Sequence, residues 1–137
     1  MRITADTNLL LRAILEDHPQ QGRQAREAMQ RASLIAVPLT VFCELVWTMR
    51  RLYQRQPGEI ADVIEAMLRV ESIVTDRPAV EMGIAMLRAG GDFADAIIAW
   101  EGAAMGGDVL GTFDREAVRL LSVIGLDAAE PGRLLQA

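Results

Sequence analysis

The sequence predicts an α/β protein with three layers, α/β/α, around a mainly parallel central sheet of four to five strands. Short β-prone runs alternate with longer amphipathic helical patterns, and parallel strands need such long crossover connections. The chain of 137 residues is 51% hydrophobic and 24% charged, which favours one compact domain over residues 1–137. No apolar run approaches the roughly 20 residues that span a bilayer, and no signal peptide is recognisable, so we expect a cytoplasmic protein without membrane contact.

The first part of the chain predicts a strand, two helices and a second strand. Residues 2–5 form a β-prone run that ends at Asp6, and residues 7–15 continue with apolar residues near helical spacing. Residues 19–32 are polar with few apolar positions, which is typical of a helix that faces solvent. Residues 33–38 form an apolar strand that a proline ends.

The middle of the chain predicts three helices and one strand. Residues 39–53 carry apolar residues close to the i, i+3, i+4, i+7 pattern, and residues 57–70 begin with a proline, as helices often do. A strand is expected over 72–75. Residues 77–91 form a further amphipathic helix, closed by two glycines that supply the backbone freedom needed at a helix end.

The last part of the chain predicts one very apolar helix, a strand, a helix and a tail. Residues 92–107 open with Asp92 as a helix cap and are apolar nearly throughout, so this helix is expected to be buried on most sides. A strand follows over 108–113 and a helix over 115–125. Residues 126–137 predict an edge strand with a tail.

Four acids are expected to meet at one edge of the sheet. Asp6 and Asp114 follow the first and fourth predicted strands, and Glu44 lies early in the helix that leaves the second. Asp95 lies in the first turn of a helix that begins at the same edge. Because the carboxyl ends of parallel strands share one edge, these four side chains should converge there.

Converging carboxylates require a cation. Two of them about 4 Å apart repel by roughly 4 kcal/mol at an effective dielectric near 20. Oxygen ligands without histidine or thiol suit Mg²⁺ or Mn²⁺, and such an ion can activate water against a phosphodiester. Structural roles remain as alternatives: Asp92 is interpreted as a cap, with assistance to Asp95 left open, and Asp114 could merely cap the next helix. Glu44 is interpreted as functional because its apolar surroundings would otherwise bury a charge.

The sequence lacks the residues that several other enzyme chemistries require. Cys43 and His18 are each the single residue of their type, which excludes histidine-dependent nucleophilic sites and zinc clusters; Cys43 is expected to be a small buried residue and His18 a loop residue. Every basic residue is an arginine, so lysine-dependent nucleotide binders, receiver domains and dehalogenase-like phosphatases are disfavoured. The net charge of −5 is unusual for a nucleic-acid binder.

Four stretches resemble the VapC-type toxins of the PIN-domain family: ADTNLLLR, PLTVFCELVWTM, DFADAIIAW and VLGTFDREA, in that order. The resemblance implies a ribonuclease with Asp6, Glu44 and Asp95 as the core metal ligands and Asp114 as a fourth. Asn8 and Thr112 match polar positions around the family site. It also implies a homodimer, an antitoxin partner and a structured RNA substrate.

Two groups of side chains are candidates for contact with other molecules. The arginines closest to the motifs, which could guide the RNA backbone, are Arg12, Arg50, Arg51 and Arg115. Trp47 and Trp100 lie on apolar helices, where a core position competes with contact to an antitoxin or a second subunit. The serious rival to an enzyme is a non-catalytic PIN-like binding or assembly module.

Overall fold

The structure is a computed structural model that describes residues 1–136, and it confirms the predicted α/β class. Ala137, the last residue of the predicted tail, lies outside the described residues. The described helices and strands follow one another as β1 (Arg2–Thr4), α1 (Thr7–Ile14), α2 (Pro19–Arg31), β2 (Leu34–Ala36), α3 (Leu39–Arg51), α4 (Pro57–Leu68), β3 (Ile73–Val74), α5 (Arg77–Arg88), α6 (Phe93–Ala104), β4 (Leu110–Gly111), α7 (Arg115–Val123), β5 (Ala128–Ala129) and α8 (Pro131–Leu134).

The main sheet has three parallel strands in the order β1-β2-β3, and Ile35 of β2 is in register with Ile3 and Ile73. The prediction of four to five strands in this sheet is therefore wrong. β4 exists where it was expected, but it pairs in parallel with β5 in a separate sheet of two strands, through Leu110 and Ala128.

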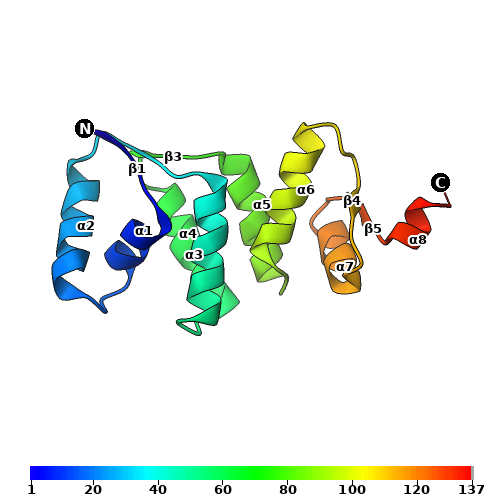
Figure 1. Ribbon diagram of the computed structural model, residues 1–137, viewed down its shortest axis with the longest axis horizontal. Coiled ribbons are helices and arrows are strands. Elements are labelled where there is room, and N and C mark those ends of the chain that lie inside the picture. The colour runs from blue at the N-terminus through cyan, green and yellow to red at the C-terminus, as the bar shows by residue number, and fades with distance from the viewer. Residues whose placement is uncertain (137) are drawn as a thin grey trace.

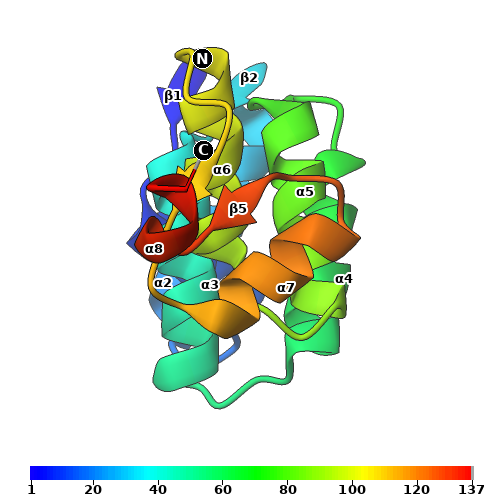
Figure 2. The ribbon, with the colours of Figure 1, turned by 90° about the vertical axis from the view of Figure 1, so that its right-hand side faces the viewer.

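Packing explains why the sheet divides. In Figures 1 and 2, α5 and α6 stand between the main sheet and the C-terminal elements. The larger core lies on the side of β1, β2 and β3, whereas a smaller core forms between α6 and α7. The small core contains Leu120 and Leu121 of α7, with Leu110 and Ala128 packed against it. Strands β4 and β5 therefore bury their apolar residues away from β1.

One local expectation also fails: helix α6 is buried on one side only, since Ile98 is 55% exposed while Ala96 and Ile97 are buried. His18 lies in a loop, as predicted; it is the N-cap of α2, and its Nδ1 accepts a hydrogen bond from the Gln21 amide at 3.2 Å. None of the helices within residues 1–136 combines the length and the apolar character needed to cross a membrane.

Candidate metal and active site

Asp6 stands at the carboxyl end of β1 and caps α1. Its Oδ1 accepts a hydrogen bond from the Leu9 amide at 2.8 Å, while its backbone is extended, as an N-cap requires. The preceding residue, Ala5, continues the parallel pairing by donating its amide to the Ala36 carbonyl at 2.9 Å. Asp6 is exposed, and capping uses one of its two carboxylate oxygens. Its other oxygen remains available to a ligand.

Glu44 of α3 lies close to the start of α1. Its Oε2 accepts a hydrogen bond from the Thr7 hydroxyl at 2.9 Å, so it is tied to the residue that follows Asp6. The sequence interpretation that Glu44 would be a buried charge is wrong, because Glu44 is exposed while Phe42 and Leu45 are buried. Its apolar neighbours in the sequence point to the other side of the helix.

A second group of acids gathers where α6 and α7 begin. Asp92, Asp95 and Asp114 line one cavity of about 190 Å³. Asp92 caps α6 as predicted, and its Oδ1 accepts from the Ala94 amide at 2.9 Å. Asp114 caps α7 and accepts from the Ala117 amide at 3.1 Å. Asp114 thus reaches Asp95 through the start of α7, although β4 is not part of the main sheet.

The pKa of Asp95 is raised above its ordinary value. Partial burial raises its pKa, and the negative charges of Asp92 and Asp114 raise it further. Asp92, which was interpreted as a cap, therefore also acts on Asp95 electrostatically. The spacing of three residues in the first turn of a helix was the sequence signal for this pair.

The thiol of Cys43 is influenced by acids of both groups, that of Glu44 and that of Asp92. It is half-buried on α3, and its pKa is raised to about 11 by burial and then by the negative charges of Asp92, Glu101 and Glu44. The charges of both groups thus act on the same thiol.

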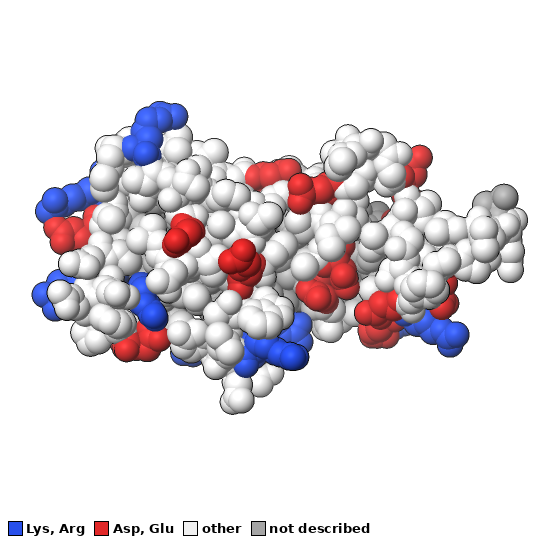
Figure 3. Space-filling view, viewed as in Figure 1, with Lys and Arg blue, Asp and Glu red and all other residues white. Residues whose placement is uncertain are grey.

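The four predicted ligands are nevertheless not one tight cage. Within residues 1–136, no three His, Cys, Asp or Glu side chains lie close enough together to hold a metal ion. On the face drawn in Figure 3, acidic side chains form several separate patches. The structure brings Glu44 beside Thr7, next to Asp6, and it brings Asp95 together with Asp114. It does not bring all four within the reach of one ion.

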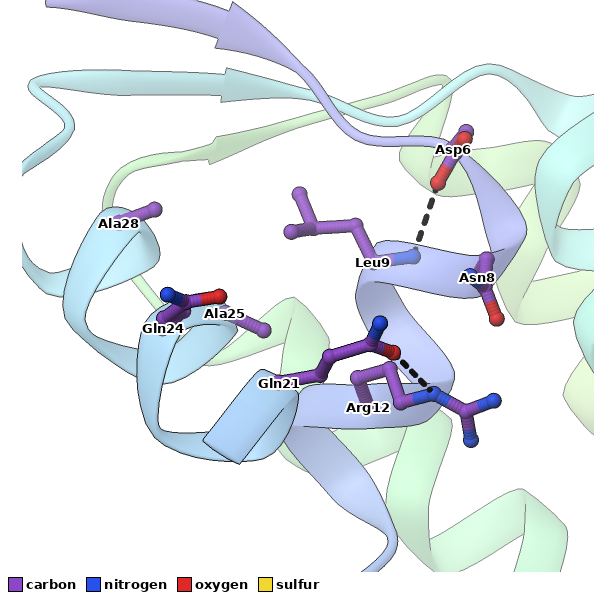
Figure 4. Close-up of a pocket in the computed structure, with 8 residues that line it drawn as sticks. All are labelled: Asp6, Asn8, Leu9, Arg12, Gln21, Gln24, Ala25 and Ala28. Atoms are coloured by element: carbon purple, nitrogen blue, oxygen red, sulfur yellow. Dashed lines mark hydrogen bonds between the residues drawn. The ribbon is translucent and has the colours of Figure 1, made fainter. Parts of the chain in front are cut away.

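The supporting polar residues have distinct surroundings. Asn8 is exposed and lines a groove of about 450 Å³ between α1 and α2, which also contains Asp6 (Figure 4). Thr112 is partly buried, and its hydroxyl accepts a hydrogen bond from the Asp114 amide at 3.1 Å. Thr7 was missed by sequence reasoning, because its bond to Glu44 joins residues 37 positions apart.

The four candidate arginines differ in their exposure and in the groups that hold their guanidiniums. Arg12 is held by Gln21 at 3.0 Å (Figure 4) and by Asp17 at 3.2 Å, which restrains its guanidinium. Arg115 is largely exposed and pairs with Glu130 at 3.3 Å.

The other two arginines lie in the last turn of α3. Arg50 donates to the Gly91 carbonyl at 3.4 Å and lines the cavity of Asp95 and Asp114. Arg51 is exposed. Arg50 is therefore the candidate arginine that lies beside the carboxylates.

Comparison with known proteins gives one family. Residues 3–121 match the family model described as PIN domain, and the matched stretch contains all four predicted acids. None of the curated proteins matches the chain.

Proposed function

Because the chain belongs to the PIN-domain family, we propose that it is a Mg²⁺- or Mn²⁺-dependent endoribonuclease that hydrolyses RNA phosphodiester bonds. PIN domains are generally nucleases and generally use divalent metal ions. The choice of RNA as substrate and of Asp6, Glu44, Asp95 and Asp114 as the catalytic and metal-binding carboxylates is our proposal.

The observation that carries the proposal is the grouping of Asp92, Asp95 and Asp114 around one cavity. Partial burial and then the negative charges of Asp92 and Asp114 raise the pKa of Asp95, and a divalent cation would relieve the repulsion among the three carboxylates. All the donors are carboxylate oxygens, which are the ligands that Mg²⁺ and Mn²⁺ prefer. The donor set therefore fits these ions in kind. Since one ion cannot reach all four carboxylates in this arrangement, Asp6 and Glu44 would be ligands at a separate position beside α1 and α3.

The side chains around the carboxylates have separate tasks in this proposal. Thr7 orients Glu44, and Thr112 fixes the backbone of Asp114, so both carboxylates are positioned before substrate arrives. Arg50 can contact an RNA phosphate beside Asp95. A bound divalent ion supplies a water of lowered pKa and neutralises charge on the phosphodiester. Hydrolysis then adds the water oxygen to phosphorus, and the departing ribose oxygen leaves as a hydroxyl.

We further propose that the protein is the toxin of a toxin–antitoxin pair, of the VapC type. This proposal rests on the resemblance of the four stretches around Asp6, Glu44, Asp95 and Asp114. It includes a cytoplasmic protein, a homodimer and an antitoxin encoded beside it. Expression of the chain alone should arrest growth, and co-expression of the neighbouring reading frame should restore growth. Growth arrest by an Asp95→Asn variant would contradict a nuclease toxin.

One observation favours the alternative of a non-catalytic binding module. The acids within residues 1–136 include no group of three that is close enough to hold a metal ion. In that alternative the carboxylates serve only as helix caps, a role that Asp6, Asp92 and Asp114 all fill here. Capping does not account for Asp95, which is partly buried and caps no helix.

The deciding experiment is cleavage of a panel of RNAs with Mg²⁺, Mn²⁺ or EDTA. The wild type should cut with either metal and stop with EDTA, while Asp6→Asn and Asp95→Asn should lose at least about 100-fold in rate, as expected when a catalytic or ligand group is removed. Asp108→Asn is the matched control, since Asp108 is exposed and lies outside both carboxylate groups. An inert wild type would establish the binding module instead, and undiminished cleavage by both variants would refute the assignment of Asp6 and Asp95 as catalytic or metal-binding residues.

A further inference from the structure

A cavity of about 470 Å³ lies away from both acid groups, among α1, α2, β2 and the loop that leads into β3. In Figure 1 these elements lie toward the α2 end of the molecule, whereas α6 and α7, at whose first turns Asp95 and Asp114 lie, stand toward the other end. Asp6 follows the carboxyl end of β1, but Ser72 of the cavity precedes β3. Because the strands are parallel, these two residues lie at opposite edges of the sheet.

Most of the cavity lining is apolar. Ile35 of β2 is 1% exposed, and Ile14 of α1 and Met29 of α2 are partly buried against the larger core. Val70, which lines the cavity from the loop before β3, is 43% exposed. The buried residues of α2 are only a glycine and an alanine, so this polar helix offers little volume to fill the space. An apolar group that enters the cavity would therefore be removed from water together with Val70.

The polar part of the lining consists of Arg26, Gln30 and Ser72. Among residues 1–136, Arg26 is the only charged residue that lines this cavity. Its Nη1 donates to the Ala13 carbonyl at 3.5 Å, at the long end of the hydrogen-bond range. Within the same part of the chain, no carboxylate forms an ion pair with Arg26. The guanidinium therefore keeps most of its five N–H donors for a ligand.

The charge of the lining indicates which ligand fits. A second cavity, of about 320 Å³ between α4 and α5, mixes two arginines with Glu65 and Glu81, so its charge favours neither anions nor cations. In the cavity of Arg26, one cation borders an apolar space without an acid. The planar fork of a guanidinium matches the two oxygens of a carboxylate. The volume of about 470 Å³ lies within the range of pockets that hold small organic ligands.

We propose that this cavity binds a small amphipathic carboxylate, whose charged group contacts Arg26 and whose aliphatic or aromatic part lies against Ile35 and Val70. The site goes beyond the proposed ribonuclease function, because it uses none of the candidate acids and needs neither RNA nor a metal ion. An uncharged apolar ligand would use the same wall without Arg26. The contribution of the charge is therefore what the experiment must isolate.

The probe is octanoate, titrated into the full chain with isotope-labelled methyl groups and followed by NMR. The methyl resonances of Met29, Ile35 and Val70 should shift and saturate, with a dissociation constant on the order of 1 mM for so small a ligand. Hexanoate should bind more weakly, by up to roughly fourfold for each buried methylene that it lacks. Octanol, which has the chain without the charge, should bind at least about 10-fold more weakly than octanoate.

Trp47 is an internal control for adsorption to exposed apolar surface. It is 58% exposed, so the core position considered for it is wrong. It lies on α3 and does not line the cavity. Its indole resonance should therefore stay unchanged while the cavity methyl groups shift.

Variants of the lining then separate charge from apolar contact. Arg26→Gln should bind octanoate at least about 10-fold more weakly and should bind octanol as the wild type does, because only a hydrogen bond to a charged group is lost. Arg23→Gln is the matched control, since Arg23 is exposed on the same helix and does not line the cavity. Val70→Glu puts a competing carboxylate into the cavity of Arg26 and should abolish the saturable shifts. Circular dichroism checks that each variant is folded.

The outcomes separate this site from the nuclease. Saturable shifts at the cavity that weaken in Arg26→Gln, but not in Arg23→Gln, support the site whether or not RNA is cut. The absence of saturable shifts at about 10 mM octanoate overturns it even if RNA is cut, since that concentration exceeds the expected dissociation constant. Equal affinities for octanoate and octanol, equal octanoate affinities of wild type and Arg26→Gln, or shifts centred on Trp47 overturn it as well.

Discussion

Gly83→Ala is expected to destabilise the protein and to disturb the second acid group. A Cβ at Gly83 of α5 would lie 2.3, 2.5 and 2.7 Å from three ring atoms of Phe93, where ordinary contacts begin near 3.4 Å. The ring must therefore retreat by about 1 Å. It has no free space to enter, because Phe93 is completely buried and packs against Phe42 with ring centroids 6.5 Å apart.

Two opposing effects set the change in stability that Gly83→Ala causes. Overpacking of a core costs about 1–3 kcal/mol, while replacing a helical glycine with alanine gains about 0.8–1 kcal/mol. The net loss of stability is therefore between about 0 and 2 kcal/mol, or a fall in Tm of up to roughly 8 °C for a domain of this size. Phe93 lies between Asp92 and Asp95, so its displacement also shifts both carboxylates. A misplacement of about 1 Å can lower a catalytic rate by about 100-fold.

Thermal unfolding followed by circular dichroism measures the first effect, and the rate of RNA cleavage measures the second. Gly102→Ala is the matched control in α6, since nothing lies within 4 Å of the added Cβ. That control should be as stable as the wild type or slightly more stable. The packing argument is refuted if Gly83→Ala melts at the same temperature as Gly102→Ala.

Three further predictions concern the ionisable groups. Because folding raises the pKa of Asp95, its contribution to stability is present at low pH and is lost as pH rises through the folded pKa. The free energy of unfolding, measured by urea in EDTA, should therefore rise for Asp95→Asn relative to wild type between about pH 4 and pH 7. A difference between the two proteins that does not change with pH would contradict the pKa shift. The pKa of Cys43 is raised from 9.0 to about 11, so its alkylation at pH 8 should be about 100-fold slower in the folded protein than in urea, and equal rates would contradict the raised value. Thr7→Val removes the hydroxyl that orients Glu44 and should weaken Mn²⁺ binding about 10- to 100-fold, whereas Thr7→Ser should retain it; no loss in Thr7→Val would show that the bond has no role.

Most elements could be predicted from local sequence patterns. The expected start of the helix after Pro38 and the cap at Asp92 are both found. These features depend on residues within a few positions of one another. The prediction also placed Asp6 at the carboxyl end of β1, where the structure has it.

The extent of the sheet could not be predicted in this way. Whether β4 pairs with β1 or with β5 depends on where Leu110 and Ala128 find apolar partners, and those partners are distant in the sequence. The apolar character of α6 indicated burial, but the exposed Ile98 shows that composition does not fix how many sides of a helix are covered.

The exposure of Glu44 and Trp47 had a signal that was not used. The buried residues of α3 are Phe42, Leu45, Val46 and Met49, which follow the i, i+3, i+4, i+7 pattern. That periodicity leaves positions 44 and 47 on the opposite face. In contrast, the bond from Thr7 to Glu44 and the separation of the acids into two groups depend on tertiary packing alone.

The central claim is that these carboxylates bind a divalent cation in the folded protein. The most direct measurement is the Tm of wild type and of Asp95→Asn during titration with Mn²⁺, each beginning in EDTA. At 100 times the dissociation constant, binding to the folded state adds about 2.7 kcal/mol, so the Tm of the wild type should rise by roughly 10 °C and that of Asp95→Asn should rise far less. An unchanged wild-type Tm at millimolar Mn²⁺, or equal shifts in both proteins, would contradict the account.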